Sequence, residues 1–222
     1  IYGLYTGAVY FLGLPGGWLA DRLLGGQKAV WYGGIIIMIG HIILAIPHDY
    51  SFFIGLIFVA TGTGLLKPNI SAMVGQLYSD ADERRDGGYA IYYMGINMGS
   101  LIGYYVCGYF MENVGWHWAF GAAAVGMAIG LVQYKLTLNN LPKHSALPAN
   151  PLGSKGTSRA WGGIAAFIIA AAAVTTAAMT GTIVINPTVV AGYTAIVFTI
   201  IFFVYFGVIY FTGNLTDAEK QR

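Results

Sequence analysis

The stretch SFFIGLIFVATGTGLLKPNISAMVGQLY, residues 51–78, holds 28 residues and a single charged side chain, that of Lys67. A helix of this length is about 42 Å long at 1.5 Å per residue, which exceeds the ~30 Å hydrocarbon core of a bilayer. The run is continuously apolar and lacks the alternating pattern of a membrane β-strand. Residues 51–78 therefore predict a transmembrane helix and an all-α integral membrane protein.

The composition agrees with a membrane protein. Hydrophobic residues make up 57% and charged residues 9% of the 222, and the mean hydropathy is +0.65. Soluble domains average about 25% charged residues. The net charge of +2 indicates no nucleic-acid partner, and the single Cys107 excludes a disulfide framework. Six further segments are long and apolar enough to span a bilayer: 1–20, 29–47, 88–111, 116–135, 161–182 and 188–212.

The basic residues predict the orientation of these seven segments. All but one of the 11 Lys and Arg side chains fall in alternate loops and the tail, which the positive-inside rule assigns to the cytoplasm. The exception is Lys67. Since the first segment then runs inward, we expect at least one further helix upstream of Ile1, and the chain to be an internal part of a longer protein.

Lys67 and Pro68 stand next to each other deep in the 51–78 segment. A helical register places Lys67 at least about 16 Å from either end, beyond the reach of snorkelling. A central Lys costs about 2.5–3.5 kcal/mol on insertion scales, so it needs a carboxylate, a water-filled cavity or both. No acidic residue lies at that depth, so we expect its partner outside the chain or on a bound anionic group. Pro68 cannot donate to the Gly64 carbonyl, which predicts a bent or interrupted helix lining a transporter cavity. The alternative is a kink that only shapes the bundle, with Lys67 paired to hold helices together.

The segment at 88–111 carries two different faces. Tyr89, Tyr93 and Asn97 recur every four residues and share one face of the helix. A stripe of glycines at 95, 99 and 103 shares another, which predicts close packing of a neighbouring helix. One face therefore packs and the other presents hydrogen-bonding groups, although an interhelical hydrogen bond explains Asn97 equally well.

The composition also divides the chain. Residues 138–160 are rich in Pro, Ser, Asn and Gly, which predicts a flexible cytoplasmic linker. The predicted organisation is a five-helix N-terminal bundle at 1–137, this linker, a transmembrane helical hairpin at 161–213, and the start of a further linker at 214–222.

Three motifs resemble those of known transporters. GGWLADRLLGGQK, residues 16–28, resembles the loop motif between helices two and three of the major facilitator superfamily. GTGLLKPNIS (62–71) and DERRDGGYAIYYMGINMGS (82–100) closely resemble the two signatures of the proton-coupled oligopeptide transporter (POT/PTR) family. The resemblance implies a partial major facilitator fold: helices two to six of the N-terminal bundle, without helix one, plus the two-helix insertion of bacterial members.

The resemblance also assigns roles to residues. It implies that Tyr10, Lys67, Tyr93 and Asn97 bind substrate and that Lys67 takes part in proton coupling. Asp21 and Arg22 match the cytoplasmic gate motif, and we interpret Arg84, Arg85 and Asp86 as part of a gating salt-bridge network, where the alternative is a solvated loop. The helix-one E-x-x-E-R motif and the C-terminal bundle are not in this sequence. The resemblance implies that the helix-one carboxylates are the counter-charges to Lys67 and that a glutamate of the C-terminal bundle binds the peptide amino group.

The function implied is secondary active transport: proton-coupled symport of di- and tripeptides into the cell by alternating access, across the inner membrane of a bacterium. The expected partners are the peptide, membrane lipid and the remaining helices of the same polypeptide, with protons as coupling ion and no cofactor, metal or nucleic acid. One alternative is a transporter of the same superfamily for another small substrate, such as a drug or nitrate. The other is a Mg²⁺-dependent membrane prenyltransferase, suggested by the spacing of Asp82 and Asp86. Such an enzyme needs a second acidic cluster, and no other cytoplasmic loop supplies one. We therefore expect no enzyme.

Overall fold

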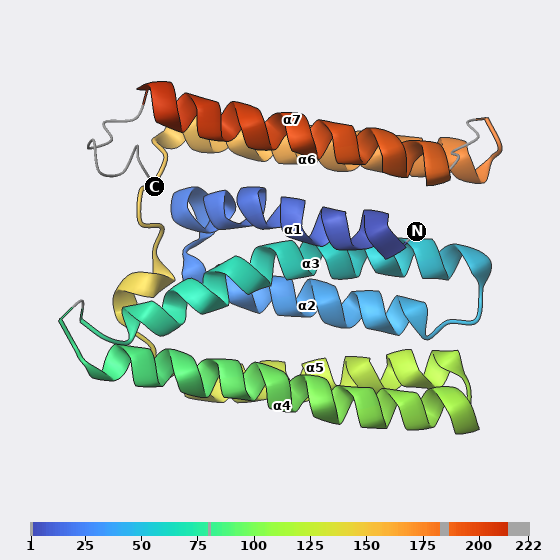
Figure 1. Cartoon of the computed structure of the whole chain (residues 1–222), viewed down its shortest axis with the longest axis horizontal. Coiled ribbons are helices and arrows are strands. Elements are labelled where there is room, and N and C mark those ends of the chain that lie inside the picture. Colours follow the sequence, from blue (N-terminus) through green and yellow to red (C-terminus); the bar gives the residue numbers. More distant parts are fainter. Residues whose placement is uncertain (1, 80, 183–186, 213–222) are drawn as a thin grey trace. The chain divides into compact units, whose positions relative to one another are not determined.

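The computed structural model describes residues 2–79, 81–182 and 187–212, and the regular elements in these ranges are all helical. They are α1 (Tyr2–Leu19), the π-helix η1 (Ala20–Leu24), α2 (Gly26–Leu44), α3 (Asp49–Gln76), α4 (Arg84–Asn113), α5 (Trp116–Thr137), the short 3₁₀ helices η2 (Leu138–Asn140) and η3 (Lys143–Ala146), α6 (Ser154–Met179) and α7 (Pro187–Thr212) (Figure 1). The all-α prediction is confirmed, and each predicted segment coincides with one long helix.

The chain divides into two compact units. One comprises Tyr5–Ala170, with α2 to α5, nearly all of α1 and the first part of α6. The other combines residues 1–4 with residues 171–222 and contains the whole of α7 and the last part of α6. All the predicted site residues lie in the first unit.

Four of the described helices contain stretches long and apolar enough to cross a membrane: Gly26–Leu44, Tyr50–Gln76, Trp116–Asn140 and Ser154–Val174. The helices α1, α4 and α7, which the sequence also predicts as spans, fall outside this set, and α7 holds a shorter apolar stretch, Gly192–Val208. For α4 the reason lies in its sequence, because charged residues at its start and polar residues such as Asn97 lower its hydropathy. A multi-pass membrane protein follows from these apolar helices.

Glycines bring α2 and α3 into close contact. A Cβ built on Gly33 would lie 2.8 Å from the Gly62 carbonyl oxygen, and one on Gly40 would lie 3.0 Å from that of Gly55. In each helix the two glycines that make these contacts are seven residues apart, which is about two helical turns, so they lie on one face. Small residues let transmembrane backbones approach closely. This pairing fixes the register of the two antiparallel helices.

The glycine stripe predicted on α4 does not pack in this way. A Cβ built on Gly95, Gly99 or Gly103 would meet nothing within 4 Å among the described residues. The expected helix contact at the stripe is therefore not made within the described chain, and the close backbone approach occurs between α2 and α3 instead.

We expect Gly62→Ala to destabilise the bundle by about 1–3 kcal/mol, the usual range for overpacking. The added Cβ would lie 2.6 Å from the Gly33 carbonyl oxygen, and backbone atoms cannot yield cheaply. Thermal unfolding of the chain in detergent, followed by circular dichroism, measures the effect. The control is Gly99→Ala, whose Cβ has open space and whose helix propensity improves. Equal melting temperatures for the two variants would contradict the glycine contact.

A second close contact joins α1 to α3 beside two prolines. Gly16, directly after Pro15 in α1, packs against the backbone of Gly64 in α3. The Asn69 side chain is 6% exposed, and its Nδ2 donates to the carbonyl oxygens of Gly16 at 3.2 Å and Leu65 at 2.6 Å. Despite Pro68, α3 remains one continuous helix and changes direction along its length (Figure 1). The helix is thus bent rather than broken, and Asn69 ties the bend to α1.

Candidate functional site

Lys67 and Tyr10 meet where α1 crosses α3. The Lys67 Nζ lies over the Tyr10 ring, 4.7 Å from its centroid, within the range of a cation–π contact. The crossing at Gly16 and Gly64 positions the pair, because Gly64 stands one turn before Lys67 on the same helix. Both side chains are exposed in this chain. Two residues predicted to bind substrate, 57 positions apart, are therefore in direct contact.

The Lys67 ammonium has no acidic partner in the part of the chain that the structure describes, since none of its carboxylates forms an ion pair with it. The π-face of Tyr10 offers a partial negative charge that attracts the cation but leaves its other directions open. The sequence prediction that the counter-charge comes from elsewhere is consistent with this geometry. A bound carboxylate could approach the ammonium from the side away from the ring.

Tyr93 and Asn97 lie exposed on α4, one turn apart. The Asn97 Nδ2 donates to the Tyr93 carbonyl oxygen at 2.8 Å, so its hydrogen bond stays within its own helix. Within the described ranges, the interhelical bond considered as an alternative for Asn97 is not formed. Tyr89, predicted on the same face, instead reaches α3, where its hydroxyl donates to the Ser71 carbonyl oxygen at 3.4 Å. Among the predicted substrate-binding residues, Lys67 of α3 thus contacts Tyr10 of α1, and Asn97 contacts Tyr93 on the same helix.

The predicted gate residues Asp21 and Arg22 lie in η1, Ala20–Leu24, which we call the gate segment. Residues 141–152, which we call the strap, form hydrogen bonds with this segment. The backbone N–H of Asn150 donates to the Asp21 carbonyl oxygen at 2.9 Å, and that of Leu152 to the Arg22 carbonyl oxygen at 3.3 Å. The Arg22 guanidinium donates back to the Asn150 carbonyl oxygen at 3.4 Å. The strap therefore holds the gate segment by its backbone.

A buried network fastens the strap to the start of α2. The Gln27 Nε2 donates to the Pro142 carbonyl oxygen at 3.0 Å and to the Ser145 Oγ at 2.9 Å. From α5, the Tyr134 hydroxyl donates to the Gln27 carbonyl oxygen at 3.0 Å. Gln27 is 8% and Ser145 3% exposed. These bonds anchor the strap to α2 at the buried Ser145, a contact that the prediction of a flexible linker at 138–160 does not include.

Gly25 makes the contact between the strap and the gate segment possible. Its φ of 82° lies in the region that L side chains rarely adopt, and a Cβ there would lie 2.6 Å from the Ala146 carbonyl oxygen. Glycine is therefore required both by the backbone conformation and by the approach of the strap. The sequence marks this position only as one of several glycines.

At the start of α4, the predicted network member Arg84 forms an ion pair with Asp82 of the preceding loop. The Arg84 Nη2 donates to Asp82 Oδ2 at 2.8 Å, and its Nε donates to Asp82 Oδ1 at 3.0 Å. These side-chain hydrogen bonds, together with the Arg84 backbone N–H, lower the pKa of Asp82 to about 2. Asp86 lies in the first turn of α4, where a negative charge is favourable. Because Arg84 occupies the Asp82 carboxylate, this loop does not present the free acidic pair that Mg²⁺ would need.

We expect the Asp82 carboxyl group to titrate near pH 2 in the folded protein. Its pKa lies below the ordinary 3.8, so the ionised form stabilises the fold above about pH 4, and this contribution is lost as the pH falls through about 2. Carboxyl-carbon NMR of the protein measures the midpoint. In Arg84→Gln the midpoint should rise towards 3.8, whereas a wild-type midpoint already near 3.8 would contradict the ion pair.

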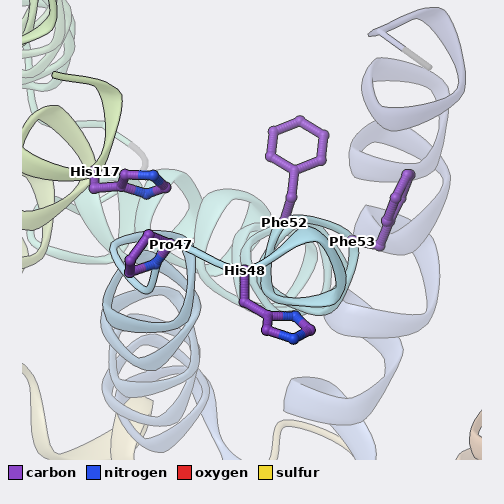
Figure 2. Close-up of a pocket in the computed structure, with 5 residues that line it drawn as sticks. All are labelled: Pro47, His48, Phe52, Phe53 and His117. Atoms are coloured by element: carbon purple, nitrogen blue, oxygen red, sulfur yellow. The ribbon is translucent and has the colours of Figure 1, made fainter.

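A separate pocket of about 490 Å³ lies at the connection between α2 and α3 and the starts of α3 and α5. It is lined by Pro47, His48, Phe52, Phe53 and His117 (Figure 2). None of the predicted site residues lines it. The His48 Nδ1 accepts a hydrogen bond from the Tyr50 backbone N–H at 3.3 Å and so caps the start of α3. Figure 2 shows its ring turned away from His117. Among the described residues, no group of three or more His, Cys, Asp or Glu side chains is arranged to hold a metal ion.

Comparison with known proteins places this geometry among transporters. A model of the POT family matches residues 27–159. The chain is 49% identical over 138 residues to a peptide transporter of Yersinia enterocolitica, covering 61% of this chain and 27% of that protein. It is 46% identical over 157 residues to a di-/tripeptide transporter of Lactococcus lactis, covering 70% of this chain and 32% of that protein. These relatives are transporters, which excludes the prenyltransferase alternative.

Solved structures give the same result for the fold. The chain matches the crystal structure of a POT family transporter in complex with a thioalcohol-conjugated peptide, with a TM-score of 0.88 and 34% identity. The match covers 98% of this chain and 45% of that one. The partial major facilitator fold predicted from the motifs is therefore confirmed. The chain spans less than half the length of the relatives it matches.

Proposed function

The chain belongs to the POT family, and on that premise we propose that it is part of a transporter that carries di- and tripeptides into the cell together with protons. Support comes from the relatives described as peptide and di-/tripeptide transporters and from the peptide complex of a similar structure. Because these relatives come from bacteria, we place the proposed transporter in the inner membrane.

The observation that carries the proposal is the Lys67 ammonium on the Tyr10 ring. A short peptide is a zwitterion, and its terminal carboxylate is the group that an unpaired ammonium at mid-helix would recognise. Contact with the ring at 4.7 Å fixes the position of the ammonium without neutralising its charge. From α4, Tyr93 and Asn97 supply hydroxyl and amide groups for the peptide backbone. We assign Tyr10, Lys67, Tyr93 and Asn97 to substrate binding on this basis.

Proton coupling follows from competition for one cation. If a protonatable carboxylate elsewhere in the complete transporter pairs with Lys67, then protonation of that carboxylate releases the ammonium for the peptide carboxylate. Peptide and proton occupancy would then bias the same equilibrium between outward-facing and inward-facing states, as linkage requires. In this proposal the coupling ion is the proton, and no other cofactor takes part.

Alternating access needs elements that move relative to the site. Among the described residues, we propose the bend of α3 near Lys67 and the gate segment, which the strap holds, as two such elements. We assign gating roles to Asp21 and Arg22 in the gate segment and to Arg84, Arg85 and Asp86 at the start of α4. Charges at helix ends can exchange partners as helices rock, which makes them suited to this role.

Uptake by the complete transporter that contains this sequence tests the proposal. In liposomes with an alkaline interior, labelled dialanine should accumulate, and dissipating the pH gradient should abolish accumulation. Unlabelled di- and tripeptides should compete, whereas a tetrapeptide, alanine and nitrate should not. Competition by nitrate or by a drug, but not by peptides, would instead assign the protein to another substrate class of the superfamily.

A further inference from the structure

A basic and aromatic cluster lies where the start of α2 meets the end of α5, and it shares no residue with the Lys67 site. The Trp31 ring of α2 stacks on the Tyr134 ring of α5, with the ring centroids 6.4 Å apart. The Lys135 Nζ lies over the Trp31 ring, 5.3 Å from its centroid, within the range of a cation–π contact. The cluster therefore holds an ammonium group against an indole face at the junction of two helices.

Lys28 adds a second cation to this surface. It precedes Trp31 by three residues, so the two side chains are neighbours on the surface of α2. Lys28 and Lys135 are both exposed. Among the described residues, neither lysine forms an ion pair with a carboxylate, since the ion pair found there joins Arg84 to Asp82. Two ammonium groups thus stand on one surface without an acidic partner from the described chain.

The helix contact beneath the cluster is closely packed. The Tyr134 hydroxyl donates to the Gln27 carbonyl oxygen at 3.0 Å. About one turn further into α2, a Cβ built on Gly34 would lie 2.7 Å from Cδ2 of the buried Leu131. These contacts fix the two backbones relative to each other, so the cluster is preformed and a ligand need not assemble it.

The cluster lies at the depth of lipid headgroups. Both helices contain candidate membrane spans, Gly26–Leu44 and Trp116–Asn140. Lys28 stands in the first turn of one span and Lys135 near the end of the other. The distribution of Lys and Arg assigns these ends to the cytoplasmic side, where indole rings favour the interface and basic side chains attract anionic lipid.

The surface beyond the cluster favours a lipid over a free anion. Ile39 and Ile42 follow Lys28 by about three and four helical turns, so they lie on the same face of α2. Both side chains are exposed, at 38% and 50%. A ligand with its phosphate at Lys28 could therefore lay an acyl chain along this face.

We propose that this cluster binds the phosphate headgroup of an anionic phospholipid in the cytoplasmic leaflet. Lys28 and Lys135 supply ammonium groups to the phosphate oxygens, and Trp31 holds the Lys135 ammonium in place. A zwitterionic headgroup carries a cation of its own, which two lysines repel. The cluster therefore selects a headgroup with a net negative charge.

Quenching by brominated lipid tests the proposal in the complete transporter that contains this sequence. Trp31 is kept as the sole tryptophan, and the bilayer mixes dibrominated phosphatidylcholine with phosphatidylglycerol. Phosphatidylglycerol bound beside Trp31 excludes the brominated lipid and restores fluorescence. We expect it to bind there at least tenfold tighter than phosphatidylcholine. Lys28→Gln and Lys135→Gln should each lower this preference severalfold, since a cation at the membrane surface contributes roughly fivefold, and the double variant should leave less than twofold.

Two controls separate this site from a general attraction of the protein for anionic lipid. Lys155→Gln removes an exposed positive charge from the start of α6 and should change the preference at Trp31 less than twofold. Trp116 is 63% exposed at the opposite end of α5. With Trp116 as the sole tryptophan, the preference should be absent.

A measurement on the protein with all its tryptophans guards against a folding defect in the single-tryptophan forms. In native mass spectrometry with equal amounts of the two lipids, the parent should retain phosphatidylglycerol, and the double variant at least fivefold less. Equal binding of the two lipids at Trp31 would overturn the proposal. A preference that survives the double variant, or that is as large at Trp116, would do the same.

Discussion

Replacing Lys67 by alanine is expected to reduce gradient-driven dipeptide accumulation at least thirtyfold in the complete transporter. Truncating one partner of a desolvated charge pair typically costs about 2–5 kcal/mol, and each 1.4 kcal/mol is a factor of ten. The structure leaves the ammonium with only the Tyr10 ring as a partner among the described residues, so the substrate carboxylate would be its main counter-charge. Transport of labelled dialanine into liposomes measures the loss.

Three further variants separate the charge of Lys67 from its contact with the Tyr10 ring. Lys67→Arg keeps the charge but not the geometry, and it should restore less than half of the transport, because a planar guanidinium cannot replace a compact ammonium. Tyr10→Phe keeps the aromatic face and should transport well, whereas Tyr10→Leu should lose severalfold. Undiminished pH-driven accumulation by Lys67→Ala would rule out this role for the residue.

The helices and the Lys67–Tyr10 pair were predictable from the sequence for different reasons. Apolar length alone gives the helices, since a span needs about 20 such residues. The assignment of Tyr10 and Lys67 to one binding site follows only from the resemblance to the POT family, because no spacing rule relates positions on two helices. The sequence does give the reason for their contact, once α1 and α3 are known to cross at Gly16 and Gly64.

The α4 glycine stripe shows what periodicity cannot decide. Glycines four residues apart share a face, but the pattern does not say whether this chain supplies the helix that meets it. The glycines that do pack, such as Gly33 and Gly62, are paired across α2 and α3 and form no stripe of four-residue spacing. Contact between helices depends on both partners, whereas the pattern describes one.

The contacts of the strap could not be predicted, because composition does not distinguish an ordered turn from a flexible linker. Pro, Asn, Ser and Gly serve both, since each favours turns through its own backbone geometry. The residues that order the strap lie far away in the sequence: Gln27 is 118 positions from Ser145, to which its amide donates. No local signal in residues 138–160 indicates that contact. A polar Gln at the first turn of an apolar helix was the only available indication.

Replacing Gln27 by leucine is therefore expected to release the strap and destabilise the bundle by about 2–3 kcal/mol. The change removes two hydrogen bonds of the Gln27 amide and leaves the Ser145 hydroxyl, 3% exposed, with one fewer partner in an apolar setting. The matched control is Gln133→Leu, the same change at an exposed position of α5. Thermal unfolding in detergent compares the two variants.

Hydrogen exchange distinguishes loss of the strap from general destabilisation. In Gln27→Leu the amides of Asn150 and Leu152, which bond to Asp21 and Arg22, should exchange at least tenfold faster, while those in the middle of α3 change little. Because Gln27 and Ser145 share one bond, Gln27→Leu combined with Ser145→Ala should cost less than the sum of the single changes. Additive effects, or uniform acceleration of exchange across the bundle, would show that the strap does not hold the gate segment.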